Sequence, residues 1–118
     1  MGMQEKARNL HAGKVTEGRT KGDLKEVSAQ FPEGVTIRNA EVLHDVKRGT
    51  DYAVVVFEET ADKFYFCGSV ITNFMKELIA TYESKDAFDA DLLATGLKVS
   101  VERVRSKNGN VYNKFTVL

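Results

Sequence analysis

The order of apolar patterns after residue 34 restricts the fold more than any other feature of this sequence. Three strand-like segments come first, each joined to the next by a short turn: VTIRNAEVLHDV, YAVVVFEE and KFYFCG. A helical pattern follows over residues 69–82, where apolar side chains recur with a period near 3.6 residues. Two further strand-like segments, LKVSVERVRS and VYNKFTVL, flank a glycine turn. The predicted order is strand, strand, strand, helix, strand, strand.

This order is that of an OB-type barrel, which has five strands and a helix between the third and fourth. Closure into a barrel also removes the exposed edges that an open sheet of short strands would leave. We therefore expect a mainly β protein with a five-stranded OB-type barrel, and an open sheet with one covering helix is the competing architecture. A short N-terminal helix is expected after Asp23, which can cap it, and before Pro32 and Gly34, which end it.

Two local patterns refine the strands. The apolar parity of the first strand shifts between Ile37 and Ala40, which predicts a β-bulge near Arg38 and Asn39. In the second strand, residues 54–57 are apolar without alternation, as in a strand that is covered on both faces.

The length of 118 residues is sufficient for one domain and too short for two. Glycines interrupt residues 1–22, so we expect a flexible N-terminal arm there and a single OB-type domain over residues 23–118. The single cysteine, Cys67, excludes an intrachain disulfide, and its spacing from His11 and His44 matches no metal-ligand pattern. No cofactor or metal is therefore expected.

No apolar run approaches the roughly 20 residues that a membrane span needs. The start of the chain lacks the apolar core of a signal peptide. We expect a cytoplasmic protein without membrane contact.

Equal numbers of acidic and basic residues, 17 of each, conceal an uneven distribution. Residues 35–95 carry six basic and eleven acidic side chains, whereas residues 96–118 carry five basic and one acidic. A basic end of this kind favours an anionic partner such as nucleic acid, although less strongly than a basic protein would.

The C-terminal hairpin RVRSKNGNVYNKF can be registered in two ways. A two-residue Asn-Gly loop would mix polar and apolar side chains on both faces. A three-residue loop at 107–109, with a left-handed glycine, pairs Val101 with Phe115 and Glu102 with Lys114, both favourable cross-strand pairs. We therefore predict the three-residue loop.

This register gives Arg103, Arg105 and Lys107 the parity of core residues, yet an unpaired arginine cannot lie in a small core. The hairpin is therefore predicted to extend past the barrel, with these cations near its tip. The turn after the first strand carries Lys47 and Arg48, so both hairpins end in basic residues. The alternative is that such charges only keep long hairpins soluble and prevent edge pairing.

In an OB barrel these two loops flank a binding face on the second and third strands. Tyr52 and Tyr65 are the best candidates for exposed rings on that face, and Tyr112 is a further candidate, because a tyrosine ring can lie outward with its hydroxyl hydrated. Half-buried packing is the alternative for each tyrosine. The phenylalanines of the same strands are assigned to the core: Phe57, Phe64 and Phe66.

Three segments together resemble the small single-stranded-DNA-binding proteins of bacteriophages and mobile elements: PEGVTIRNAEVLHDVKRGTDYAVVVFEE, FYFCGSVITNFM and KVSVERVRSKNGNVYNKFTVL. The resemblance covers roughly residues 24–118. It implies an OB fold, coating of single-stranded DNA in replication or recombination, and in many members a homodimer. The chain ends NKFTVL, without the acidic tail of bacterial relatives, so recruitment of partners through such a tail is not expected.

The predicted function is non-enzymatic binding of single-stranded DNA. Its predicted contacts are Lys47, Arg48, Tyr52, Tyr65, Arg103, Arg105, Lys107 and Tyr112. A protein-interaction module, acting as an inhibitor or assembly factor through the acidic loop EETADK and residues 83–91, is the alternative. An enzyme is disfavoured because no nucleophile and base, and no set of carboxylates, is brought together by the predicted elements.

Overall fold

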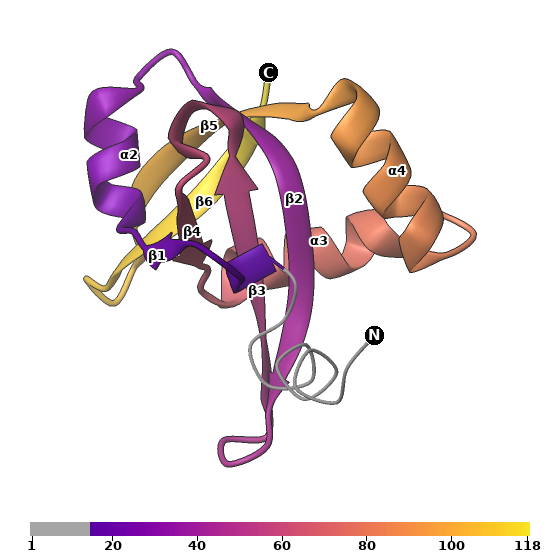
Figure 1. The fold of residues 1–118 in the computed structure, drawn as a ribbon. Coiled ribbons are helices and arrows are strands. Elements are labelled where there is room, and N and C mark those ends of the chain that lie inside the picture. Colours follow the sequence, from indigo (N-terminus) through magenta and orange to yellow (C-terminus); the bar gives the residue numbers. More distant parts are fainter. Residues whose placement is uncertain (1–14) are drawn as a thin grey trace.

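One sheet of six strands forms the centre of the computed structural model, which describes residues 15–118 (Figure 1). The strand order across the sheet is β1-β4-β3-β2-β5-β6, and only the β1–β4 pair is parallel. The strands are β1 (Thr20–Lys21), β2 (Val35–Asp45), β3 (Thr50–Phe57), β4 (Lys63–Phe66), β5 (Leu97–Arg105) and β6 (Val111–Val117).

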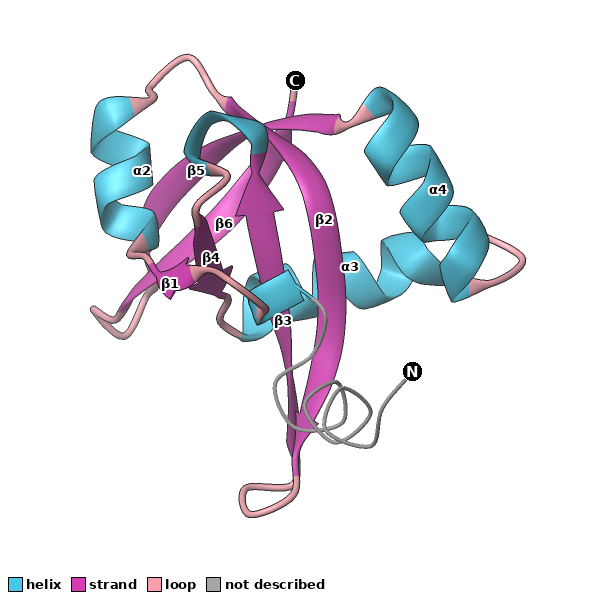
Figure 2. Cartoon of the chain, viewed as in Figure 1, coloured by secondary structure: helices cyan, strands magenta, loops and turns pink. Residues whose placement is uncertain are grey.

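Three helices in the described residues cover the sheet, and Figure 2 separates them from the strands by colour. They are α2 (Leu24–Gln30), α3 (Ser69–Ala80) and α4 (Lys85–Thr95), with a single 3-10 turn, η1 (Glu58–Thr60). Each helix contributes buried apolar side chains to one main core, which includes Val27 of α2, Met75 of α3 and Phe88 of α4. None of these helices is both long enough and apolar enough to cross a bilayer.

The expected strands are all present as β2 to β6, and the expected helices as α2 and α3. The closed barrel is wrong, however, because β4 and β6 do not pair within the described residues and the sheet stays open. The outer edge of β4 is occupied instead by β1, where the Thr20 amide donates to the Asp62 carbonyl (3.0 Å) and the Gly22 amide to the Phe64 carbonyl (2.8 Å). With those acceptors used, β6 has no partner on that edge.

The boundary of the expected arm also differs. Its residues 1–14 lie outside the described part of the chain, but residues 15–22 belong to the fold. Val15 is only 7% exposed, and its amide donates to the Glu41 carboxylate at 2.8 Å. This difference could not be predicted from the sequence, because a two-residue strand has no periodicity to detect.

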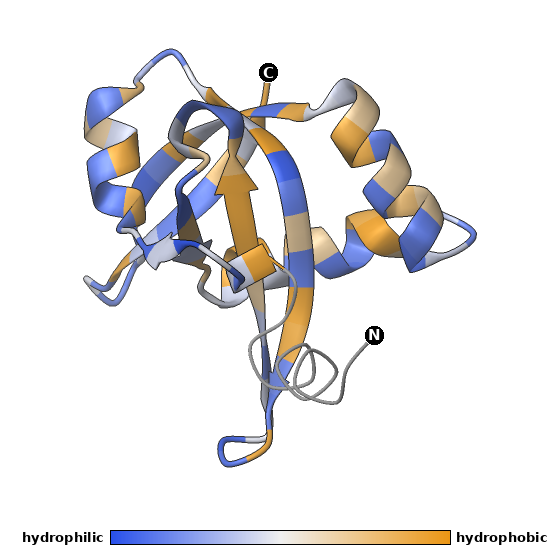
Figure 3. Ribbon diagram, viewed as in Figure 1, coloured by the Kyte–Doolittle hydropathy of each residue, from blue (hydrophilic) through white to orange (hydrophobic). Residues whose placement is uncertain are grey.

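The prediction of a strand covered on both faces is confirmed for β3. Ala53, Val55 and Phe57 point into the main core, whereas Val54 and Val56 pack with Val15 in a second, smaller cluster on the opposite face. The hydropathy colouring of Figure 3 shows this strand as an almost uninterrupted apolar band towards its upper end.

Three further local predictions are confirmed. The register of β2 against β3 shifts between Ile37 and Asn39, as expected of a bulge. Asp23 caps α2, since its carboxylate accepts from the Lys25 amide at 2.9 Å. The β5–β6 hairpin has the predicted three-residue loop, with Gly109 at φ 85°.

The helix content between β4 and β5 is larger than expected. One helical pattern was expected there, over residues 69–82, but a second helix follows it: α4, of 11 residues, which is capped by the Ser84 hydroxyl. Phe88 and Leu92 anchor α4 to the core. The full helix was not predicted because its apolar face is short and aspartates surround it in the sequence.

Candidate functional site

A row of three aromatic rings lies on the outer face of β3 and β4, opposite the main core. The centroid of the Phe66 ring is 5.6 Å from that of Tyr52 and 5.2 Å from that of Phe64, in edge-to-face contacts. The pairing of Phe66 with Val54 places these rings on the face of the second apolar cluster. Phe66 is 44% exposed, so the middle ring of this aromatic row is open to solvent.

Tyr65 is not part of the row, and the prediction of an exposed ring there is wrong. Side chains alternate along a strand, and Tyr65 pairs with Val55 on the inner face. Its ring is 2% exposed and packs 5.1 Å from the Phe57 ring. Its hydroxyl donates to the Thr60 hydroxyl at 2.9 Å, which satisfies the polar group inside the core. The assignment of Phe66 to the core is also wrong, because its side chain is exposed, whereas Phe64 is partly buried and packs against the second apolar cluster.

Two lysines that the sequence patterns did not single out lie at the paired edge of β1 and β4, and one of them contacts the aromatic row. The Lys21 ammonium lies 5.4 Å from the centroid of the Phe66 ring, within the range of a cation–π contact. Lys63 lies at the start of β4, opposite Thr20 of β1. Both positions depend on the β1–β4 pairing, which no sequence pattern predicted.

The β2–β3 hairpin carries Lys47 and Arg48 at its tip, and both side chains are exposed. The Asp45 carboxylate shapes the turn by accepting from the amides of Lys47 (3.0 Å) and Arg48 (3.3 Å), and Gly49 adopts φ 65°. The Arg48 guanidinium is 3.9 Å from the same carboxylate, a loose exposed pair. The Lys47 ammonium has no ion-pair partner within the described chain.

The stem of this hairpin is fixed to α3 by charges. Asp51 lies 2.8 Å from the Lys76 ammonium and 2.8 Å from the Nδ1 atom of His44. The hydrogen bond from Lys76 and then that from His44 lower the pKa of Asp51 below its ordinary value. Tyr52 follows Asp51 directly, so this contact fixes the strand at the end of the aromatic row.

In the β5–β6 hairpin, two classes of cation separate as predicted. The Lys114 ammonium lies 3.6 Å from the Glu102 carboxylate, so this ion pair within the hairpin explains why a cation is present at residue 114. Arg103, Arg105 and Lys107 are exposed on the part of the hairpin beyond the core, and of these only Arg103 makes a side-chain hydrogen bond in the described residues, to the Asn113 carbonyl oxygen at 3.4 Å.

Both hairpin tips project into the lower half of Figure 1, the β2–β3 tip at the bottom and the β5–β6 tip at the left. The opposite end of the molecule holds η1 and the C-terminus. In this view the two basic tips point in different directions, one downwards and one to the left. Tyr112 is partly buried and pairs with Val104, on the face of the hairpin opposite to Arg103 and Asn113. The structure thus does not bring Tyr112 together with the aromatic row.

The acidic connection between β3 and β4 is used internally. The Glu58 carboxylate lies 3.1 Å from Arg38, and the Glu59 carboxylate accepts from the Thr36 amide at 2.8 Å. Because β2, β3 and β4 are antiparallel, this connection is at the other end of the sheet from the basic tip of the β2–β3 hairpin.

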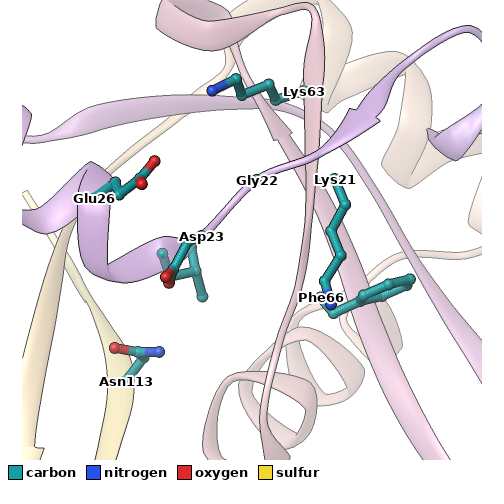
Figure 4. A pocket seen from close by; sticks show the side chains of 8 residues that line it. Lys21, Gly22, Asp23, Glu26, Lys63, Phe66 and Asn113 are labelled. Atoms are coloured by element: carbon teal, nitrogen blue, oxygen red, sulfur yellow. The ribbon is translucent and has the colours of Figure 1, made fainter.

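An open pocket of about 590 Å³ lies between α2, the β1–β4 edge and β6, where barrel closure would have occurred (Figure 4). We name it the seam pocket. Its lining residues are Lys21, Gly22, Asp23, Leu24, Glu26, Lys63, Phe66 and Asn113. Since Phe66 belongs to both, the seam pocket is continuous with the aromatic row.

The single thiol is buried and protonated at neutral pH. Cys67 is 6% exposed, and desolvation by burial raises the pKa of its thiol to about 12. Among residues 15–118, no group of three or more histidine, cysteine, aspartate or glutamate side chains could hold a metal ion.

Comparison of the chain with protein-family models, with curated proteins and with solved structures gave no match.

Proposed function

We propose that this protein binds single-stranded DNA and does so without a catalytic step. The observation that carries the proposal is the aromatic row: three rings on one sheet face, of which Phe66 contacts the other two, is 44% exposed and has the Lys21 ammonium beside it. Single-strand binders combine such rings, on which bases stack, with cations that follow the phosphates. In a duplex the bases are paired and stacked on one another, so they cannot stack on the rings of the protein.

The fold supports the same proposal. Without β1, the order β4-β3-β2-β5-β6 is that of an OB barrel whose last pairing is missing, so we propose an open variant of the OB type. In OB folds, the face of the second and third strands and the loops at strands 1–2 and 4–5 bind the ligand. These correspond here to the aromatic row and to the two basic hairpins.

The residues divide into two roles. Tyr52, Phe64 and Phe66 provide stacking surfaces, each worth about 1–3 kcal/mol per stacked base. Tyr65 is excluded because it is buried, and Tyr112 lies off this path. The phosphate contacts are proposed to be Lys21, Lys47, Arg48, Arg103, Arg105 and Lys107.

In line with the resemblance to phage and mobile-element proteins, we propose a role in coating DNA during replication or recombination in the cytoplasm. A homodimer is a further part of this proposal. The alternative of a protein-interaction module has less support, because three of the acidic groups on which it relied bind within the chain: Glu58 to Arg38, Asp89 to Lys85, and Asp91 to the Tyr82 hydroxyl.

The proposal is tested by fluorescence-anisotropy titration with a labelled oligothymidine of about 15 nucleotides and with a duplex of equal length. We expect tighter binding to the single strand, and an affinity that falls steeply between about 50 and 200 mM salt. Equal or tighter binding to the duplex would contradict the proposal.

Charge variants sharpen the test. The double variant R105Q/K107Q removes two cations without a charged partner in the described residues. The slope of log affinity against log salt should therefore become shallower by about 0.7 for each phosphate that is no longer neutralised. K114Q removes one charge from the same hairpin, but Lys114 is paired with Glu102. That control should leave the slope nearly unchanged.

A further inference from the structure

The seam pocket exists because β1, rather than β6, pairs with the edge of β4. Phe66 lines the pocket and is also the most exposed ring of the aromatic row. A strand stacked on that row would therefore pass the mouth of the pocket, which is large enough for one base. The pocket is polar, so the question is which base its groups fit.

Two carboxylates line the pocket, and only that of Glu26 has no partner in the described residues. One oxygen of Asp23 accepts from the Lys25 amide as the cap of α2, which fixes that side chain at the end of the helix. Within residues 15–118, Glu26 makes no side-chain hydrogen bond or ion pair and is an acceptor only. In Figure 4 its carboxylate points across the pocket towards Lys63, whose ammonium is likewise without a partner in the described chain.

The remaining groups are donors. Asn113 accepts from Arg103 through its carbonyl oxygen, at 3.4 Å, which leaves the amide nitrogen free. Figure 4 shows that nitrogen on the side of Asn113 that faces Phe66. The pocket therefore combines one carboxylate with the donor groups of Lys63, Lys21 and Asn113 around an aromatic ring.

We propose that the seam pocket receives a guanine base of the bound strand, an inference that rests on the proposed function. Guanine carries two adjacent donors, the N1–H and the exocyclic amine, which match the two oxygens of Glu26. Its O6 and N7 atoms are both acceptors and match the ammonium and amide donors. The ring face is left to contact Phe66.

The other bases fit this set less well. Adenine and cytosine each present an acceptor ring nitrogen beside the amine, which a carboxylate repels. Thymine has one N–H between two carbonyl groups, so it can give Glu26 a single hydrogen bond. A preference for guanine follows from the placement of one acceptor among several donors.

The test compares oligothymidines of about 15 nucleotides that carry one central guanine, adenine or hypoxanthine. Adenine stacks as well as guanine, so the difference between these two isolates hydrogen bonding. Hypoxanthine lacks only the exocyclic amine. We expect the guanine strand to bind about tenfold more tightly than the adenine strand, with hypoxanthine between them.

E26Q should reduce the preference for guanine over adenine to about twofold or less. The preference is a ratio of two affinities measured on the same variant, so a general change in affinity caused by the lost charge cancels. E33Q removes the same charge from the exposed loop after α2, outside the pocket lining, and should keep the full preference. Both side chains are exposed, and circular dichroism verifies that each variant is folded.

Three results would overturn the inference. The first is equal affinity for the guanine and adenine strands, and the second is a guanine preference that survives E26Q. The third is tight binding of free deoxyguanosine monophosphate without any effect of guanine in a strand, which would mark a nucleotide site instead. If plain oligothymidine binds but guanine has no effect, only this inference fails, whereas no binding of any strand removes the proposed function as well.

Discussion

The two faces of β3 and β4 carry similar residues but have opposite relations to solvent. On the inner face, Tyr65 and Phe57 are at most 2% exposed and belong to the main core. On the outer face, Tyr52 and Phe64 are partly buried, and Phe66 is 44% exposed. On β4 the tyrosine is thus inside and two phenylalanines outside, against the order of their polarity. The alternation of side chains along β4 therefore decides which ring is buried, rather than the polarity of the ring. Burial of the Tyr65 hydroxyl is tolerated because it donates a hydrogen bond to the Thr60 hydroxyl.

The largest effect is expected from Tyr65→Ala on the inner face. Loss of a buried aromatic ring leaves a cavity and should lower the free energy of unfolding by about 3–5 kcal/mol, measured by urea denaturation. Tyr65→Phe removes only the hydroxyl and should cost about 1 kcal/mol. A small loss for Tyr65→Ala would mean that the inner ring is not part of the core.

Gly22→Ala tests how closely β1 packs on the inner face. A Cβ atom at residue 22 would lie 2.4 Å from the Tyr65 ring, which the core holds in place. We expect a loss of about 1–3 kcal/mol in the free energy of unfolding. Gly68→Ala is the control, since a Cβ atom there meets nothing within 4 Å, and its effect should stay below about 1 kcal/mol.

Phe66→Ala on the outer face should separate binding from stability. The affinity for oligothymidine should fall by about 1–3 kcal/mol, measured by anisotropy, because an exposed stacking surface is removed. The free energy of unfolding should change by about 1 kcal/mol or less, since nearly half of the side chain is already in water. A large loss of stability without a change in affinity would contradict the difference between the faces.

The smallest effect is expected from Asp51→Asn, at the end of β3 beside α3. The pKa of Asp51 is lowered by Lys76 and His44, so its contribution to stability is present above the ordinary value of 3.8 and is lost as the pH falls through the lowered pKa. Urea denaturation should therefore show wild type more stable than the variant at about pH 7, and this difference should shrink at about pH 3. The control is Asp62→Asn, which removes an exposed carboxylate without an ion-pair partner in the described residues and should change the free energy of unfolding at pH 7 by less than about 0.5 kcal/mol.

Sequence patterns predicted the elements whose local signals are strong. The β5–β6 register followed from alternation and one left-handed glycine, the α2 cap from Asp23, and the bulge from a parity shift in β2. In the candidate site, the exposed cations of the two hairpins were predicted, because an unpaired arginine cannot be buried. The face of each ring on β4 was not predicted, because KFYFC is apolar at nearly every position and fits either parity.

What the sequence determined by itself is therefore the order of β2 to β6 with α2 and α3, the turns of the two hairpins and their basic tips, since each depends on residues close together in the chain. Tertiary structure alone decided that β1 takes the edge of β4, that the sheet stays open, and that Lys21 lies over the Phe66 ring. Those outcomes depend on which of two competing strands satisfies one row of backbone acceptors. That competition joins residues more than 40 positions apart and leaves no local trace in the sequence.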